Sequence, residues 1–94
     1  MQQIILVEDN PNLNHLLTTQ LAGVVDKVYS FYQLQPAYHF LTKRTVDLAI
    51  IDRRFKDGDG LELVDYLHQL HFYTRTLILS QLHQTEEKIK GLSS

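Results

Sequence analysis

Short, continuous hydrophobic runs alternate along the chain with longer stretches in which apolar residues recur at helical spacing. The clearest runs are Gln3–Val7 and Leu48–Ile51, and neither alternates apolar with polar positions. This is typical of parallel strands that are covered on both faces. Residues 76–79 form a third run, and residues 24–30 form a weaker one that mixes valines with charged side chains, as an edge strand does. The pattern therefore predicts four strands.

The stretches between these strands carry helix signals. Asn10 and Pro11 suit the N-cap and first position of a helix that ends at Gly23, and Pro36 suits the start of a second helix. A third helix follows the turn-rich residues 56–60, and a fourth spans residues 85–91. The positions predicted to face the core are Leu13, Leu16, Leu17 and Leu21 in the first helix, Ala37, Phe40 and Leu41 in the second, and Leu61, Leu63, Val64, Leu67 and Leu70 in the third.

Strands that alternate with helices predict an α/β fold with a parallel sheet. The 94 residues allow one domain, residues 1–94, and 44% hydrophobic with 21% charged residues indicates a globular chain. The absence of cysteine excludes disulfides and thiolate metal sites. A net charge of −2 disfavours nucleic-acid binding, and the apolar runs are too short to cross a membrane. We therefore expect an intracellular domain that binds neither a nucleic acid nor a membrane.

Polar side chains follow three of the predicted strands directly. Glu8 and Asp9 follow the first strand, Asp52 the third and Ser80 the fourth. In an open α/β sheet, ligands bind beyond the carboxyl ends of the strands. Three carboxylates gathered there would repel one another unless a hard cation such as Mg²⁺ neutralised them. A carboxylate oxygen can then attack phosphorus, and the Ser80 hydroxyl can donate a hydrogen bond to a phosphoryl oxygen.

Four motifs in this order resemble the receiver domain of bacterial two-component response regulators. They are residues 4–10 (Ile-Ile-Leu-Val-Glu-Asp-Asn), 47–52 (Asp-Leu-Ala-Ile-Ile-Asp), 59–63 (Asp-Gly-Leu-Glu-Leu) and 77–80 (Leu-Ile-Leu-Ser). The tail at residues 88–92 is similar to the transcription-factor branch. The resemblance implies a flavodoxin-like, doubly wound parallel sheet with strand order 2-1-3-4. The chain ends at Ser94, before the fifth strand and helix that the family adds.

The resemblance also implies roles for individual residues. Asp52 would accept a phosphoryl group from a histidine kinase, and Ser80 would be the switch hydroxyl. Mg²⁺ would be bound by Glu8, Asp9, Asp52 and the backbone carbonyl of Arg54. Such a domain is a cytoplasmic signalling switch that can autodephosphorylate, rather than an enzyme. Any DNA-binding output domain would lie elsewhere in the parent protein.

Some positions depart from the family pattern. Lys56 stands where proline is usual, Arg53 and Arg54 are unusual beside the site, and Gln81 replaces a small residue. The family's fifth-strand lysine and aromatic switch residue have no counterpart. An alternative is therefore a pseudo-receiver, a protein-interaction module that works without phosphorylation. An aspartate-nucleophile phosphohydrolase is disfavoured because Arg54 occupies the position of its second acid.

Other interpretations of these residues need no phosphate chemistry. Asp9 or Asn10 can simply cap the first helix. Residues 57–60 (Asp-Gly-Asp-Gly) lack the further ligands of an EF-hand and are predicted to form a turn and a helix N-cap. His68 and His71 are expected to be solvated helix residues. The edge of the predicted strand 76–79 is expected to self-associate or to be covered by the chain's own last segment.

Overall fold

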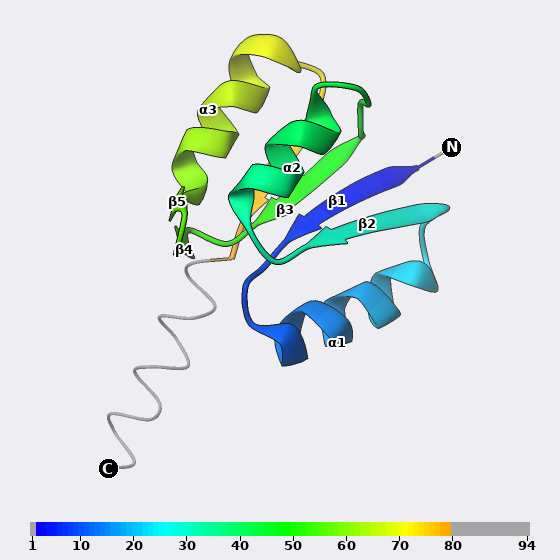
Figure 1. Ribbon diagram of the computed structural model, residues 1–94. Helices are drawn as coiled ribbons and strands as arrows, with labels where there is room; N and C mark the ends of the chain where they lie inside the picture. Colours follow the sequence, from blue (N-terminus) through cyan, green and yellow to red (C-terminus); the bar gives the residue numbers. More distant parts are fainter. Residues whose placement is uncertain (1, 80–94) are drawn as a thin grey trace.

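The computed structural model of the chain describes residues 2–79, which build a four-stranded parallel sheet with helices on both faces (Figure 1). The strands are β1 (Gln3–Val7), β2 (Lys27–Phe31), β3 (Leu48–Ile51) and β6 (Arg75–Ile78), in the order β2-β1-β3-β6. All three pairings are parallel. This arrangement confirms the predicted strand order 2-1-3-4.

Helix α1 (Pro11–Ala22) covers one face of the sheet, and α2 (Leu34–Leu41) and α3 (Gly60–Leu70) cover the other (Figure 1). The central strands therefore bury both of their faces, which explains their unbroken apolar runs. Ile5 and Val7 pack toward α2 and α3, whereas Ile4 and Leu6 pack toward α1. None of the helices in residues 2–79 has the length and apolar character needed to span a bilayer.

The second strand begins later than its valines predicted. The backbone N–H groups of Val24 and Val25 both donate to the carbonyl of Leu21, which continues the turn at the end of α1. The carboxylate of Asp26 then accepts a hydrogen bond from the N–H of Gln2 at 2.6 Å. Residues 24–26 are therefore a turn, and β2 runs from Lys27 to Phe31. β6, in contrast, begins and ends one residue earlier than predicted.

The second helix begins at Leu34, two residues before the predicted start at Pro36. Proline is tolerated there because the first N–H groups of a helix have no partner within it. The cap comes from elsewhere in the chain, because the Asp57 carboxylate accepts from the N–H groups of Leu34 and Gln35 at 3.2 and 3.0 Å. Local sequence carries no signal for such a cap.

Helix α1 packs Leu17 and Leu21 against the sheet as predicted, but it buries Asn14 and leaves Leu16 outside. Asn14 is 1% exposed, and Leu17 and Leu21, three and seven residues later, pack against the sheet with it. Leu16, predicted to be buried, is 51% exposed. Asn10 caps this helix as predicted, since its side chain accepts from the N–H groups of Asn12 and Leu13.

The predicted turn after β3 is present at residues 56–57, and it joins the two strands of a small antiparallel hairpin, β4 (Arg54–Phe55) and β5 (Gly58–Asp59). Gly58 has a φ of 148°, in the region that glycine adopts at least cost. Asp59 is the N-cap of α3 and accepts from the N–H of Leu61 at 3.0 Å, which confirms the predicted cap.

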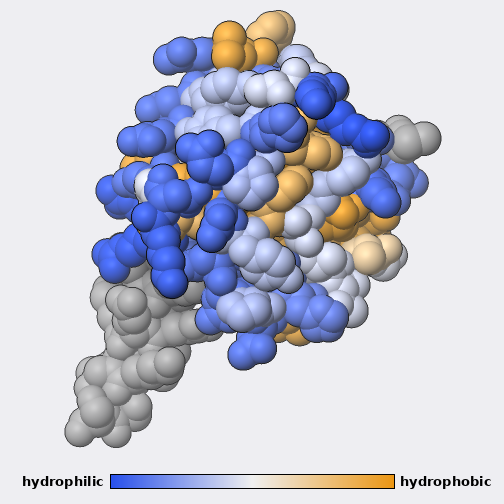
Figure 2. Space-filling model, in the orientation of Figure 1, coloured by the Kyte–Doolittle hydropathy of each residue, from blue (hydrophilic) through white to orange (hydrophobic). Residues whose placement is uncertain are grey.

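The end of α3 differs from the prediction at two positions. Leu70 is 65% exposed instead of buried, and Phe72 beyond the helix is also exposed. Figure 2 shows hydrophobic side chains at the top of the molecule, the region where α3 ends in Figure 1. His71 is 9% exposed instead of solvated, and its ring lies between those of Tyr66 and Tyr73. Its neighbour on the helix, His68, contacts Thr76.

Candidate functional site

Three carboxylates meet where β1 and β3 end. The two strands are neighbours with Val7 opposite Ile51, so the residues that follow them emerge at the same edge of the sheet. Glu8, Asp9 and Asp52 each bring an oxygen to this point, and these oxygens lie within 4.8 Å of one another. The structure thus brings together the three acids that the sequence singled out.

The backbone hydrogen bonds of the sheet continue one residue beyond the strands and hold two of these acids. Asp52 donates its N–H to the carbonyl of Val7 at 2.9 Å, and Glu8 donates its N–H to the carbonyl of Phe31 at 3.0 Å. The Glu8 carboxylate accepts from the N–H of Asn10 at 2.9 Å. Glu8 is fully buried and Asp52 is 5% exposed, whereas Asp9 is exposed. Glu8 and Asp52 are therefore buried and held by backbone hydrogen bonds, and Asp9 lies on the solvent side of the cluster.

Asn14 is a supporting residue that the sequence reasoning missed. Its side-chain amide donates to the carbonyls of Glu8 and Phe31, both at 3.0 Å, and so ties the ends of β1 and β2 together. The Thr18 hydroxyl donates to the side-chain oxygen of Asn14 at 3.3 Å. The sequence signal that could have identified Asn14 as buried is its spacing, because it lies three and seven residues before Leu17 and Leu21, on the same face of the helix.

Asp52 is held on its other side by the start of α3. The N–H of Arg53 donates to Asp52 Oδ1 at 2.7 Å, which orients the carboxylate. Gly60 donates its N–H to the Arg53 carbonyl at 2.6 Å and lies against the backbone of Asp52. A Cβ atom at Gly60 would overlap the Asp52 carbonyl oxygen and come within 2.9 Å of Ile51 Cγ2. Only glycine allows this close approach.

The arginines after Asp52 take different positions. Arg53 forms an ion pair with Asp59, with 3.6 Å between Nε and Oδ2, and both side chains are about half exposed at 49% and 44%. Arg53 thus has a structural partner on the hairpin. Arg54 begins β4 with an exposed side chain, and the role of its carbonyl remains a prediction. Ser80, Gln81 and the predicted fourth helix lie outside the described residues.

The donor set fits a hard divalent cation. Carboxylate oxygens are the ligands that Mg²⁺ prefers, and it is usually held by one or two carboxylates with several waters. One ligand on the solvent side leaves room for such waters, and the charge of the cation would offset three converging negative charges. Glu8, Asp9 and Asp52 are the described residues that would hold the ion.

The family profile of the response regulator receiver domain matches residues 4–94. The chain is 32% identical over 92 residues to the regulatory protein VanRc of Enterococcus gallinarum, covering 98% of this chain and 39% of VanRc. It is 30% identical over 94 residues to the virulence transcriptional regulatory protein PhoP of Salmonella choleraesuis, covering 100% of this chain and 42% of PhoP. The chain thus spans less than half the length of these relatives.

Solved structures give the same fold. The MaeR response regulator bound to beryllium trifluoride has a TM-score of 0.75 and 28% sequence identity, covering 83% of this chain and 66% of that chain. A receiver domain (CheY-like) from Methylobacillus flagellatus, at 24% identity and a TM-score of 0.70, covers 83% of this chain and 66% of that one. With the family match over nearly the whole chain, these findings show that it belongs to the response regulator receiver domains.

Proposed function

We propose that Asp52 accepts a phosphoryl group from a histidine kinase and that the chain thereby acts as a signalling switch. The observation that carries this proposal is the meeting of Glu8, Asp9 and Asp52 within 4.8 Å at the ends of β1 and β3. Mg²⁺, held by these carboxylates and by the Arg54 carbonyl, would supply the positive charge that lets an anionic phosphoryl group approach. Membership of the receiver family supports the same assignment.

The chemistry is a transfer between two nucleophiles. A carboxylate oxygen of Asp52 attacks the phosphorus of a phosphohistidine, the new O–P bond forms, and the P–N bond breaks. The electron pair of that bond leaves with the imidazole of the kinase. The Arg53 N–H holds the Asp52 carboxylate in one orientation, and Gly60 holds its backbone. The low exposure of Asp52 limits the access of water to the acyl phosphate.

Ser80 completes the proposal as the hydroxyl that donates to the phosphoryl group. Its support is its place at the end of the motif at residues 77–80 and the position of β6 beside β3, which brings the end of that strand to the same edge of the sheet. A cytoplasmic location, in reach of a histidine kinase, follows from this function.

The direct test is incubation with Mg²⁺ and acetyl phosphate, followed by intact-mass measurement. We expect the mass of one phosphoryl group to be added to the wild type and to Asp65→Asn, which changes an exposed acid on α3. Addition should be absent from Asp52→Asn and from samples with a chelator. A wild type that stays unmodified would contradict the proposal and favour the phosphorylation-independent pseudo-receiver. An Asp52→Asn variant that is modified would contradict the assignment of Asp52 as the acceptor.

A further inference from the structure

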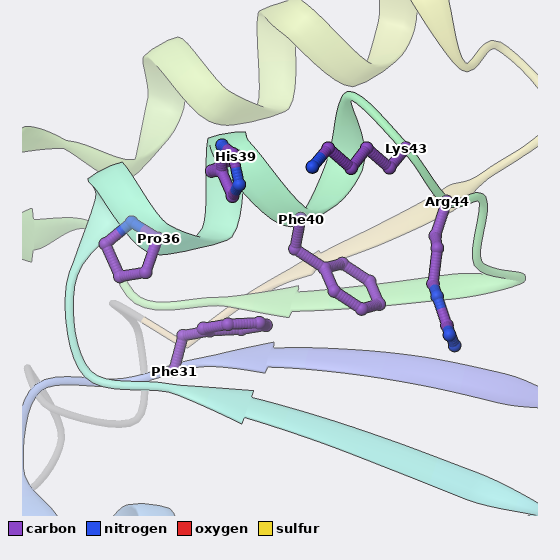
Figure 3. A pocket seen from close by; sticks show the side chains of 6 residues that line it. All are labelled: Phe31, Pro36, His39, Phe40, Lys43 and Arg44. Atoms are coloured by element: carbon purple, nitrogen blue, oxygen red, sulfur yellow. The ribbon is translucent and has the colours of Figure 1, made fainter.

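A groove opens on the molecular surface between α2 and the edge strand β2. It has a volume of about 310 Å³ and is lined by Phe31, Pro36, His39, Phe40, Lys43 and Arg44 (Figure 3). None of the three carboxylates of the candidate site lines it. The groove is thus a feature that phosphoryl transfer does not use, at the lower end of the size range of ligand pockets.

The floor of the groove is aromatic and firmly packed. The Phe31 and Phe40 rings lie 5.4 Å apart between centroids, and the Tyr29 ring lies 4.6 Å from Phe40. Figure 3 shows the Phe31 and Phe40 rings pointing toward each other from the strand and the helix. An apolar side chain entering the groove would therefore meet a preformed surface, and little ordering would be required on binding.

The rim of the groove is cationic. Lys43 and Arg44 line it, and Lys27 lies 5.6 Å from the centre of the neighbouring Tyr29 ring. Within residues 2–79, none of these three cations forms an ion pair. Arg44 donates to the Tyr29 hydroxyl at 2.9 Å, which positions its guanidinium and leaves further N–H donors for a carboxylate. This concentration of positive charge contrasts with the net charge of −2 of the whole chain.

The adjoining strand offers backbone groups to a peptide. Among the strands that residues 2–79 form, β2 pairs with β1 alone. Lys27 and Phe31 direct their backbone bonds toward β1, because the Lys27 N–H donates to Gln2 and the Phe31 carbonyl accepts from Glu8. Alternation along the strand then directs the N–H and C=O groups of Val28 and Ser30 to the open edge. An extended segment can bind there by strand addition.

From these features we infer that the groove is a docking site for an acidic, extended segment of a partner protein that carries one large apolar side chain. The apolar side chain occupies the hollow over Phe31 and Phe40. Carboxylates of the segment pair with Lys43 and Arg44, and its backbone lies along β2. The free edge of the strand favours a peptide over a lipid surface, which has no backbone groups to pair with Val28 and Ser30. The inference does not depend on phosphorylation of Asp52.

The probe is a phage-displayed library of random twelve-residue peptides, selected on the wild-type chain. Peptides retained by the double variant Lys43→Glu/Arg44→Glu are removed. We expect the enriched peptides to share acidic residues around an aromatic or aliphatic residue. Synthetic versions should bind the wild type about tenfold more tightly than the double variant in fluorescence polarisation, as two rim charges imply. The control Arg75→Glu/Lys56→Glu makes the same change in net charge at exposed residues that do not line the groove, and it should bind as the wild type does.

Three results would overturn the inference. One is the absence of enriched acidic peptides, and another is equal binding to the wild type and to the double variant. The third is stronger binding of vesicles of phosphatidylserine and phosphatidylcholine, or of a single-stranded oligonucleotide, with the same dependence on Lys43 and Arg44. That result would assign the surface to a membrane or a nucleic acid. Circular dichroism of each variant separates loss of binding from loss of folding.

Discussion

Asp57 caps the helix that begins at Leu34, 23 residues earlier in the chain. Its two carboxylate oxygens accept from the N–H groups of Leu34 and Gln35 at 3.2 and 3.0 Å. The hairpin that follows Asp52 is thereby joined to the start of α2. Asp57→Ala should lower the free energy of unfolding by about 1 kcal/mol, the usual cost of a lost cap. Urea unfolding measures this, and Asp57→Asn, which still caps, should lose less.

The same cap predicts a dependence on pH. Partial burial raises the pKa of Asp57, but the hydrogen bonds from Gln35, Leu34 and its own backbone outweigh that effect and lower the pKa below its usual 3.8. A lowered pKa means that the contribution to stability is complete above the usual value and is lost as pH falls through the folded value. The wild type should therefore lose stability relative to Asp57→Asn as the pH falls from about 5 to below the usual pKa of 3.8. A difference independent of pH would contradict the assignment.

Gly60 is expected to tolerate no side chain. Gly60→Ala places a Cβ against the Asp52 carbonyl and Ile51, so it should lower the free energy of unfolding by about 1–3 kcal/mol and slow phosphoryl uptake. The matched control is Gly23→Ala, where the added Cβ has ordinary contact with the Gln20 carbonyl at 3.5 Å. That variant should stay within about 0.5 kcal/mol of the wild type. Equal stabilities of the two variants in urea unfolding would show that Gly60 is not sterically required.

Asn14 should matter to both stability and the site. In Asn14→Ala the Glu8 and Phe31 carbonyls lose a shared donor, which should cost about 1–3 kcal/mol. Asn12→Ala, an exposed change on the same helix, should be close to neutral because alanine is a better helix former. Thermal unfolding of the two variants compares them directly. An Asn14→Ala variant as stable as Asn12→Ala would mean that the amide contributes little.

The carboxylate cluster predicts a response to Mg²⁺. Without the ion, Asp9→Asn should be more stable than the wild type, because one of three converging negative charges is removed. With Mg²⁺ at about a hundred times its Kd, the wild type should gain about 2–3 kcal/mol, and Asp9→Asn much less. Asp65→Asn should respond to the ion as the wild type does. A wild type with an unchanged melting temperature in Mg²⁺ would contradict a metal site here.

The edge strand β6 carries the prediction of self-association. Leu77 is 52% exposed on this strand, which pairs with β3 alone among the strands of residues 2–79. Self-association of this edge should appear in sedimentation velocity as a dimer whose fraction rises with concentration and falls in Leu77→Lys. The alternative, an edge covered by the chain's own last segment, should appear as a monomer with slow amide exchange along β6. Leu70→Lys changes an equally hydrophobic exposed residue off the sheet and should leave the dimer intact. A monomeric wild type with rapid amide exchange along β6 would refute this prediction.

Much of the fold was determined by the sequence alone. Unbroken apolar runs specify buried parallel strands, and their alternation with helices specifies the topology, because both patterns follow from local periodicity. The acids that follow Val7 and Ile51 could be placed at one edge for the same reason. Even the cap residues Asn10 and Asp59 were predicted, since a cap acts on the two or three residues after it.

Contacts between segments far apart in the chain were decided only by the tertiary structure. The start of α2 depends on Asp57, which no local pattern connects to Leu34. The buried face of α1 depends on carbonyls of β1 and β2 that Asn14 satisfies, so that a polar residue is buried where Leu16 was expected. The groove over Phe31 and Phe40 exists because a strand and a helix pack side by side. Local periodicity specifies which residues form an element, whereas the hydrogen-bond and packing needs of neighbouring elements specify where it begins and which face it buries.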